Sequence, residues 1–282
     1  MGVSVEVMSD SEFRDLADAV HQITGISIKE ARRTMLEGRI RRHLRDLDLA
    51  DYPSYLNRIE SDEQARLTFV DLVTTNETYF HRTPRVWSYI NEKLLPSWHA
   101  AGNKKTFNAW SAAASTGEEA HTLGIMLEVF KRQHANFDYQ IHGTDIASSV
   151  IKTANLGVYN GKSISRFRRE CPDHFATFMT GNETDGYSVL DCIKRKIQFQ
   201  TGNLFELKPS HIKYDLILLR NVLIYFTNSD QSLVMKHLHD RLSPDGITII
   251  GESESLNYIE TDFEAIEHTI YRPRRRDKKA SN

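Results

Sequence analysis

The chain has 282 residues, of which 40% are hydrophobic and 26% charged, and its formal net charge is -2. This length suffices for one large domain with a smaller one beside it. The balanced charge gives no general reason to expect nucleic acid as a partner. No stretch approaches the ~20 apolar residues of a membrane span, so we expect no direct insertion into a membrane.

The chain has only two cysteines, Cys171 and Cys192. Neither has a partner at metal or redox spacing, so we expect unpaired thiols, no metal site and a reducing, cytoplasmic compartment. The first residues include Glu6 and Asp10 and lack a basic start followed by an apolar run, so no signal peptide is expected. We also expect a monomer.

Residues 1–75 have a helical pattern and predict a small all-helical N-terminal domain. Breaks are expected at Gly25, at Asp48 to Pro53 and near Ser61, where glycine, proline and short polar residues interrupt the pattern. The domain should therefore consist of several short helices.

One of these helices, predicted over Lys29 to Leu47, is amphipathic. Its apolar positions are Leu36, Ile40, Leu44 and Leu47, and its opposite face carries Arg41, Arg42 and Arg45. A basic face is commonly no more than a solvated surface. The alternative is a docking surface for an acidic partner, and the pattern leaves both open.

A polar cluster with two aromatic residues follows, over Thr74 to Arg82. Such a mixture makes a poor core, but it would serve as a lid over a site at a domain boundary. We therefore predict a linker over residues 76–90 that contributes to a ligand site. The alternative is a helix end capped by Thr75 or Asn76.

From Thr106 onward, strand and helix patterns alternate within a domain predicted to span residues 91–282. Strands are expected at Thr106–Trp110, Tyr139–Ile146, Lys196–Gln200, Tyr214–Leu219 and Ile247–Gly251. Helices are expected between them at Glu118–Gln133, Ala147–Leu156 and Asp230–Leu242. This alternation predicts an α/β fold with a mainly parallel, doubly wound sheet.

Two further segments depart from this alternation. Phe263 to Arg272 alternates apolar and polar residues and predicts an added edge strand. Between Tyr159 and Arg195 the order lapses, apart from a short strand signal at Tyr187 to Asp191, and we predict a small inserted subdomain there.

The first predicted strand of this domain ends in small residues, from Ser111 to Gly117, and then opens a helix with Glu118 and Glu119. Strand, small-residue turn and helix are typical of a nucleotide-binding unit, because small side chains let a ligand approach the backbone. The two carboxylates would repel a phosphate, so we predict a nucleoside with hydroxyls or a positive charge. S-adenosylmethionine is such a ligand. The three spaced glycines of dinucleotide sites are absent.

Polar residues also follow the other strands at the carboxyl edge of the sheet, where open α/β folds bind ligands. Asp145 ends the second strand and is placed to accept hydrogen bonds from ribose hydroxyls. The alternative for Asp145 is the N-cap of the next helix. Asn203 and the pair Arg220 and Asn221 fall at the same edge.

With these clusters the sequence resembles the chemotaxis receptor methyltransferase family, CheR. The similarity covers nearly the whole chain and is carried, in the family's order, by Thr74 to Arg82 (TTNETYFHR), Ala109 to Ala120 (AWSAAASTGEEA), Gly143 to Ile146 (GTDI), Leu219 to Phe226 (LRNVLIYF) and Gly251 to Leu256 (GESESL). It implies a helical N-terminal domain, a linker and a Rossmann-like methyltransferase domain with an inserted antiparallel β-subdomain. It also implies methyl transfer from S-adenosylmethionine to glutamate side chains of a chemoreceptor.

The resemblance assigns roles to the residues that match its motifs. The cofactor-binding set would be Asn76, Thr78, Arg82, Glu119, Asp145, Asn203, Leu204, Arg220 and Asn221, and the catalytic pair Arg82 and Tyr225. His81, Thr83 and Glu252 depart from the family's usual aromatic, acidic and histidine residues, which leaves acceptor preference more open than cofactor binding.

The resemblance also gives the basic helix face a task. Receptor methylation regions are helical bundles rich in glutamate, so Arg41, Arg42 and Arg45 would form the substrate-docking face. Two alternatives remain at this point. One is a methyltransferase of RNA or a small molecule, and the other is a regulatory scaffold that binds the cofactor without turnover.

Overall fold

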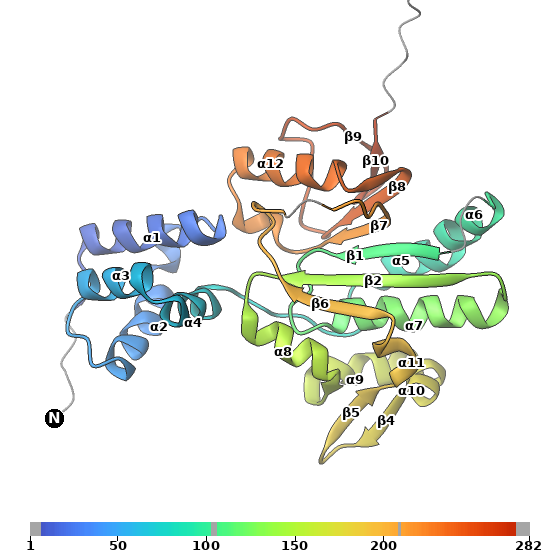
Figure 1. Ribbon diagram of the computed structural model, residues 1–282, viewed down its shortest axis with the longest axis horizontal. Coiled ribbons are helices and arrows are strands. Elements are labelled where there is room, and N and C mark those ends of the chain that lie inside the picture. The colour runs from blue at the N-terminus through green and yellow to red at the C-terminus, as the bar shows by residue number, and fades with distance from the viewer. Residues whose placement is uncertain (1–6, 103–105, 208–209, 275–282) are drawn as a thin grey trace, which may run out of the picture.

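The computed structural model describes residues 7–102, 106–207 and 210–274. An all-helical N-terminal unit lies beside a seven-stranded sheet domain, and a small three-stranded antiparallel sheet is inserted in the latter (Figure 1). This architecture confirms the predicted fold class.

The N-terminal unit is built from short helices with clear start and stop signals. They are α1 (Asp10–Thr24), the 3-10 turn η1 (Glu30–Arg32), α2 (Arg33–Asp46), α3 (Tyr52–Ser61) and α4 (Glu63–Val73). Ser9 and Glu12 form a capping box at the start of α1, and Gly25 ends it with φ of 73°. Asp51 and Asp62 cap α3 and α4 with their side chains. The breaks therefore fall where the sequence predicts them.

The large sheet has the order β6-β2-β1-β7-β8-β10-β9. Its strands are β1 (Thr106–Ser111), β2 (Asp138–Asp145), β6 (Ile197–Thr201), β7 (Tyr214–Leu219), β8 (Leu242–Ile250), β9 (Phe263–Glu267) and β10 (Ile270–Pro273). β6, β2, β1, β7 and β8 pair in parallel, so their carboxyl ends share one edge. In register, Trp110 of β1 lies between His142 of β2 and Ile217 of β7.

The carboxyl-terminal part of the sheet differs from the prediction. Phe263 to Arg272 is not one strand but a hairpin, in which β10 pairs antiparallel with both β8 and β9. The turn between them is made by His268 and Thr269, and Thr269 has φ of 67°. β8 begins at Leu242 rather than Ile247, so the preceding helix α12 (Asn228–His239) ends earlier than predicted.

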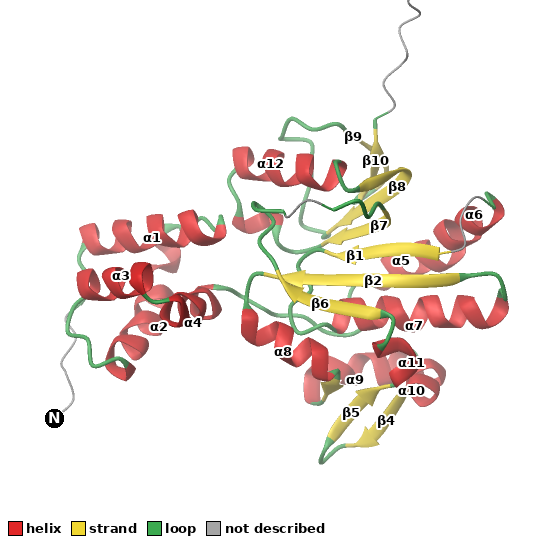
Figure 2. Cartoon of the chain, viewed as in Figure 1, coloured by secondary structure: helices red, strands yellow, loops and turns green. Residues whose placement is uncertain are grey.

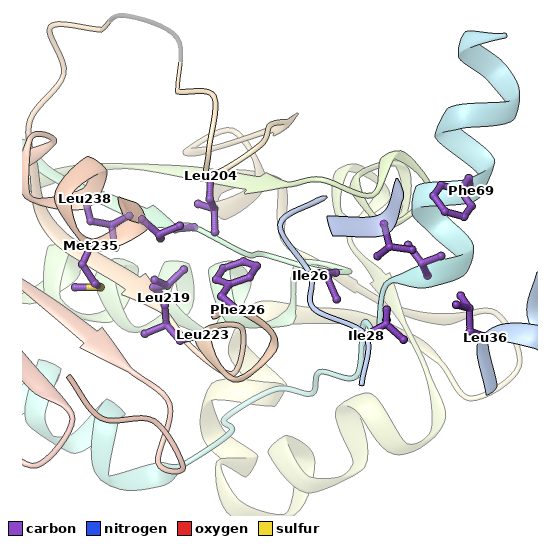
Figure 3. Packing of buried hydrophobic residues seen from close by; sticks show 14 of the residues in the cluster. Ile26, Ile28, Leu36, Phe69, Leu204, Leu219, Leu223, Phe226, Met235 and Leu238 are labelled. Atoms are coloured by element: carbon purple, nitrogen blue, oxygen red, sulfur yellow. The ribbon is translucent and has the colours of Figure 1, made fainter. Parts of the chain in front are cut away.

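Helices cover both faces of the large sheet (Figure 2). The helical elements of this domain outside the inserted subdomain are α5 (Pro84–Tyr89), the π-helical η2 (Ile90–Leu94), α6 (Leu95–Ala100), α7 (Glu118–Gln133), α8 (Ser148–Leu156), the 3-10 turn η3 (Leu223–Tyr225) and α12. The described residues form two hydrophobic clusters, one on each face of the sheet. The cluster on the α12 side runs on through Ile26 and Ile28 to Leu36 and Phe69 of the N-terminal unit (Figure 3).

The inserted subdomain lies between β2 and β6 in the chain. It contains β3 (Val158–Tyr159), α9 (Gly161–Glu170), α10 (Pro172–Phe178), β4 (Met179–Asn182), β5 (Gly186–Val189) and α11 (Asp191–Lys194). The strands pair antiparallel in the order β3-β5-β4. Within the described residues, no helix combines the length and apolarity needed to cross a bilayer.

Candidate functional site

A cavity opens at the carboxyl edge of the large sheet, between the N-terminal unit, the linker and the ends of the strands. It encloses about 930 Å³ of space between atoms, counting the space open to solvent. Every residue predicted to bind the cofactor or act in catalysis lines it: Asn76, Thr78, Arg82, Glu119, Asp145, Asn203, Leu204, Arg220, Asn221 and Tyr225. The structure thus brings these residues together, while their individual roles stay predictions.

Two walls of the cavity have different origins. We call the first the strand-edge wall, which consists of residues at or just after the strand ends: Ala112, Ala113, Ser115, Glu119, Asp145, Asn203, Leu204, Arg220 and Asn221. We call the second the linker wall, which consists of residues 74–79 and Arg82.

An ion pair stands at the centre of the strand-edge wall. Glu119 Oε2 accepts a hydrogen bond of 2.9 Å from Arg220 Nη1, and its Oε1 accepts one of 2.8 Å from Ser111 Oγ. The side chains of Arg220 and Glu119 are only 2% and 12% exposed. Because Arg220 neutralises this carboxylate, the prediction that Glu119 repels phosphate as a free charge is wrong.

Glu118, the neighbouring carboxylate, does not line the cavity. It is 3% exposed and accepts a hydrogen bond of 2.6 Å from Thr116 Oγ1. Burial raises the pKa of Glu118 above its ordinary value. The repulsion argument therefore fails for this residue as well.

Asp145 is fixed by the turn that follows β1. Its Oδ2 accepts a hydrogen bond of 2.8 Å from the Ser115 N–H, and its Oδ1 accepts one of 3.0 Å from Ala147. Burial raises the pKa of Asp145, an effect that these N–H donors oppose. The N-cap of α8 is Ala147, so the alternative of Asp145 as that N-cap is wrong.

The turn after β1 requires glycine at its end. Gly117 has φ of 95°, and a Cβ there would lie 2.8 Å from Ala154 Cβ and 2.9 Å from Tyr159 Oη. A larger residue would push the start of α7 away from α8. The small-residue signal in the sequence thus reflects close packing beneath the site as well as space for a ligand.

Glu254 is a buried carboxylate that the sequence analysis missed. Its Oε2 accepts hydrogen bonds of 3.0 Å from the Asn221 N–H and 2.5 Å from the Gly251 N–H. Asn221 has φ of 62°, and Glu254 holds it in this uncommon conformation. Burial raises the pKa of Glu254. The motif from Gly251 to Leu256 contained the signal, since acidic residues occur in the loop that follows a buried strand.

The linker wall has no regular secondary structure between Val73 and Pro84. Helix α4 ends with Thr74 as its C-cap, so the alternative of a helix end capped by Thr75 or Asn76 is wrong. Ser115 Oγ donates a hydrogen bond of 2.9 Å to the Asn76 carbonyl, which ties the linker to the strand-edge wall. Arg82 Nη1 donates one of 3.1 Å to the Glu77 carbonyl. The chain of contacts continues at Arg82 O, which accepts from Arg220 Nη2 and Trp87 Nε1, each at 2.9 Å.

The N-terminal unit completes the cavity with Thr24 and Ile26, which sequence reasoning also missed. The Ser27 N–H donates a hydrogen bond of 2.8 Å to the Tyr225 carbonyl. The guanidinium of Arg32 lies 5.0 Å from the centre of the Tyr225 ring. In the sequence, this region was marked only by the helix break predicted at Gly25. A helix break does not show which part of the chain will pack against it.

The three arginines predicted to dock a substrate differ in exposure. Arg42 and Arg45 are exposed on α2. Arg41 does not project outward as predicted, because it is half-buried and forms an ion pair with Glu37 one turn before it. None of the three lines the cavity.

Two residues that depart from the family's usual pattern lie at other contacts. Glu252 forms an exposed ion pair of 3.3 Å with Arg85 of α5. His81 contacts the inserted subdomain through Glu170, with 3.4 Å between Nδ1 and Oε2. In the part of the chain that the structure describes, no group of three or more His, Cys, Asp or Glu side chains is arranged to hold a metal ion.

Comparisons with known proteins agree with this geometry. Residues 11–74 match the family described as "CheR methyltransferase, all-alpha domain", and residues 76–272 match "CheR methyltransferase, SAM binding domain". The chain is 30% identical over 263 residues to the chemotaxis protein methyltransferase of Vibrio parahaemolyticus, covering 92% of this chain and 94% of that one. It is 28% identical over 268 residues to that of Escherichia coli, covering 94% and 91%.

Among solved structures, PKMT2 from Rickettsia typhi in complex with AdoHcy aligns with a TM-score of 0.36 and 15% identity. The alignment covers 63% of this chain and 26% of that chain. A similarity this weak adds nothing on function.

Proposed function

Because this chain belongs to the CheR methyltransferase family, we propose that it transfers methyl groups from S-adenosylmethionine to glutamate side chains of methyl-accepting chemotaxis receptors. The product is a glutamate methyl ester. The observation that best supports this function is that the predicted cofactor-binding residues and the catalytic pair Arg82 and Tyr225 line the same cavity. We further propose that the reaction takes place in the cytoplasm and that the enzyme is a monomer.

The cavity fits S-adenosylmethionine. Arg220 Nε is buried and has no hydrogen-bond partner among the described residues, so it is a donor suited to the cofactor's carboxylate. Asp145 would accept from the ribose, and Asn203 with Leu204 would lie on the adenine side. Ala112 and Ala113 leave the backbone open to a ligand. When bound, the cofactor supplies a methyl group activated by a positively charged sulfur.

The chain's own groups then have a limited task, because an ionised glutamate is already a nucleophile and needs no general base. Arg82 forms no ion pair with a carboxylate within the described residues. Its charge can therefore attract the acceptor carboxylate and hold it for in-line attack, with Tyr225 donating a hydrogen bond beside it.

The exposed charges of α2 support an acidic helical bundle as the partner. Arg42 and Arg45 are exposed and can contact receptor glutamates. Arg41 forms an ion pair with Glu37 on the same helix, which stabilises the turn that carries them. Replacing the three with alanine should raise the KM for receptor and leave cofactor affinity unchanged. An unchanged KM would contradict the docking role.

To test this function, a receptor cytoplasmic fragment is incubated with the enzyme and methyl-labelled S-adenosylmethionine and is then treated with alkali. A glutamate ester releases the label as methanol, whereas alkali-stable label or label on RNA would contradict the proposal. Arg82→Ala should lower kcat while S-adenosylhomocysteine still binds. Cofactor binding without transfer to any receptor fragment would favour the regulatory scaffold.

A further inference from the structure

The backbone around Arg82 is held in an uncommon conformation. His81 and Thr83, the residues on either side, both have positive φ, at 58° and 62°. For residues other than glycine such angles cost free energy, and they persist only where neighbouring structure enforces them. The contacts that enforce this conformation therefore decide where the Arg82 guanidinium lies.

Those contacts come largely from helix α9 of the inserted subdomain, and they reach three consecutive residues before Arg82. The Phe80 N–H donates a hydrogen bond of 2.9 Å to the Ser163 carbonyl. The Phe80 ring is fully buried and stacks on Phe167, with 5.5 Å between ring centres. These contacts fasten the middle of the segment to α9.

Tyr79 connects α9 to Arg82 more directly. The guanidinium carbon of Arg82 lies 5.5 Å from the centre of the Tyr79 ring, and that of Arg166 in α9 lies 5.8 Å from the same ring. One aromatic ring therefore contacts both cations. Each contact has the distance at which a ring face attracts a cation.

Glu170 closes the arrangement on the other side. Arg166 Nε lies 2.9 Å from each oxygen of Glu170, and Glu170 Oε2 lies 3.4 Å from His81 Nδ1. Arg166 and Glu170 thus fix each other between Tyr79 and His81. Moving either would remove a contact of Tyr79 or His81, two of the residues that precede Arg82.

From these contacts we infer that Arg166 and Glu170 are positioning residues for Arg82, so that the inserted subdomain sets the geometry of methyl transfer. This inference rests on the proposed function for its catalytic consequence. It predicts an effect on kcat, since α9 acts on the placement of Arg82 and contributes no residue to the cavity.

The chain offers a matched control on the same helix. Arg168 is also ion-paired, to Glu183 at 2.8 Å, and its guanidinium also lies 5.6 Å from the rings of Phe175 and Tyr187. All these partners belong to the inserted subdomain. Arg168→Ala removes the same charge and the same type of contact without touching the linker.

The experiment compares Arg166→Ala, Glu170→Gln and Arg168→Ala with the wild type in methyl transfer to a receptor fragment. We expect Arg166→Ala to lower kcat by roughly threefold to thirtyfold with KM for the receptor unchanged. Glu170→Gln should have a smaller effect in the same direction, and Arg168→Ala none. Arg166→Lys should restore part of kcat, because an ammonium also binds a ring face.

A second measurement does not depend on turnover. Amide hydrogen exchange of Phe80 and His81, whose N–H groups are bonded to Ser163 and Thr122, should be faster in Arg166→Ala than in the wild type or Arg168→Ala. Equal kcat and equal exchange in Arg166→Ala, Arg168→Ala and the wild type would overturn the inference. If the wild type forms no ester but the exchange difference appears, the proposed function fails and the positioning contact stands.

A second pair of variants applies if Arg166→Ala does not fold. Tyr79→Leu should then show the lower kcat and the faster amide exchange expected of Arg166→Ala, and Tyr79→Phe should not. Equal behaviour of these two variants would overturn the inference.

Discussion

The strand-edge wall and the linker wall face the same cavity, but different forces hold them. The strand-edge wall is fixed by the parallel sheet and by buried groups such as Arg220 and Asp145. The linker wall has no ladder of backbone hydrogen bonds and depends on single contacts from α2, α7, α9, the turn after β1 and Arg220. One half of the site is thus part of the core, and the other half is placed by its neighbours.

Removing the buried charge of the strand-edge wall should have the largest effect. Arg220→Ala leaves Glu119 buried without its partner, and we expect the free energy of unfolding to fall by about 3–5 kcal/mol. Denaturant unfolding would measure this loss, and calorimetry should show that cofactor binding is lost too. The double variant Arg220→Ala, Glu119→Ala should regain part of the stability. A loss below about 1 kcal/mol would place the pair among surface ion pairs.

Removing the ring that anchors the linker wall should lower the free energy of unfolding by an amount at the low end of the usual range for a buried aromatic ring. Phe80→Ala vacates a site between Tyr159 and Phe167. We expect a loss of about 3 kcal/mol, at the low end for Phe→Ala, because the linker can move away without unfolding the sheet. Unfolding curves and the affinity for S-adenosylhomocysteine should both report it. A loss as large as that of Arg220→Ala would mean that the linker is as integral as the strands.

Relieving the strain of the linker should separate stability from activity. Thr83 has positive φ and no side-chain capping bond to α5, so Thr83→Gly should change the free energy of unfolding by no more than about 1 kcal/mol. The added freedom next to Arg82 should nevertheless lower kcat. Thermal unfolding and methyl-transfer rates measured on the same variant test this. Gly117→Ala serves as the comparison, because adding a side chain at this positive φ should lower stability. A Thr83→Gly enzyme with wild-type kcat would contradict the link between backbone strain and placement.

The smallest effect should be a pH dependence located at His81. Burial lowers the pKa of His81 below 6.5, although Glu170 opposes this shift and Arg166 and His174 add to it. Below pH 6.5 the unfolded chain therefore binds a proton at His81 that the folded protein does not, so stability falls as the pH drops from 6.5 through the lower folded pKa. His81→Phe should lose less stability than the wild type between about pH 8 and about pH 5. Parallel curves for the two proteins would rule out His81 as the source.

The sequence predicted the strand-edge wall far better than the linker wall. Parallel strands end at one edge, so Asp145, Asn203 and Arg220 could be placed together from the strand pattern alone. Patterns do not show which charges neutralise each other, and the pairing of Glu119 with Arg220 joins residues of two different strand-helix units. Glu254 was missed for the same reason, since one of its partners, the Asn221 N–H, belongs to another loop.

The sequence predicted where the linker wall lies in the chain but not its conformation. The cluster from Thr74 to Arg82 was recognised by its composition, yet its conformation is set by Ser163, Thr122 and Ser115, which are distant in the chain. The contribution of Thr24 and Ile26 depends on how the N-terminal unit packs on the sheet domain, and helical periodicity does not contain that information. Arg41 shows a related limit, because the helical pattern placed it on the outer face and did not reveal its ion pair with Glu37.

The hydrophobic cluster that runs from Phe69 through Ile26 to Leu219 has a thermodynamic consequence (Figure 3). Because apolar packing continues across the boundary near residue 75, neither side can lose its order without exposing the other. We expect the helical unit and the sheet domain to melt as one cooperative body, with a ligand in the cavity raising the transition temperature of both. Two segments that look separable along the chain should therefore behave as a single unit of unfolding.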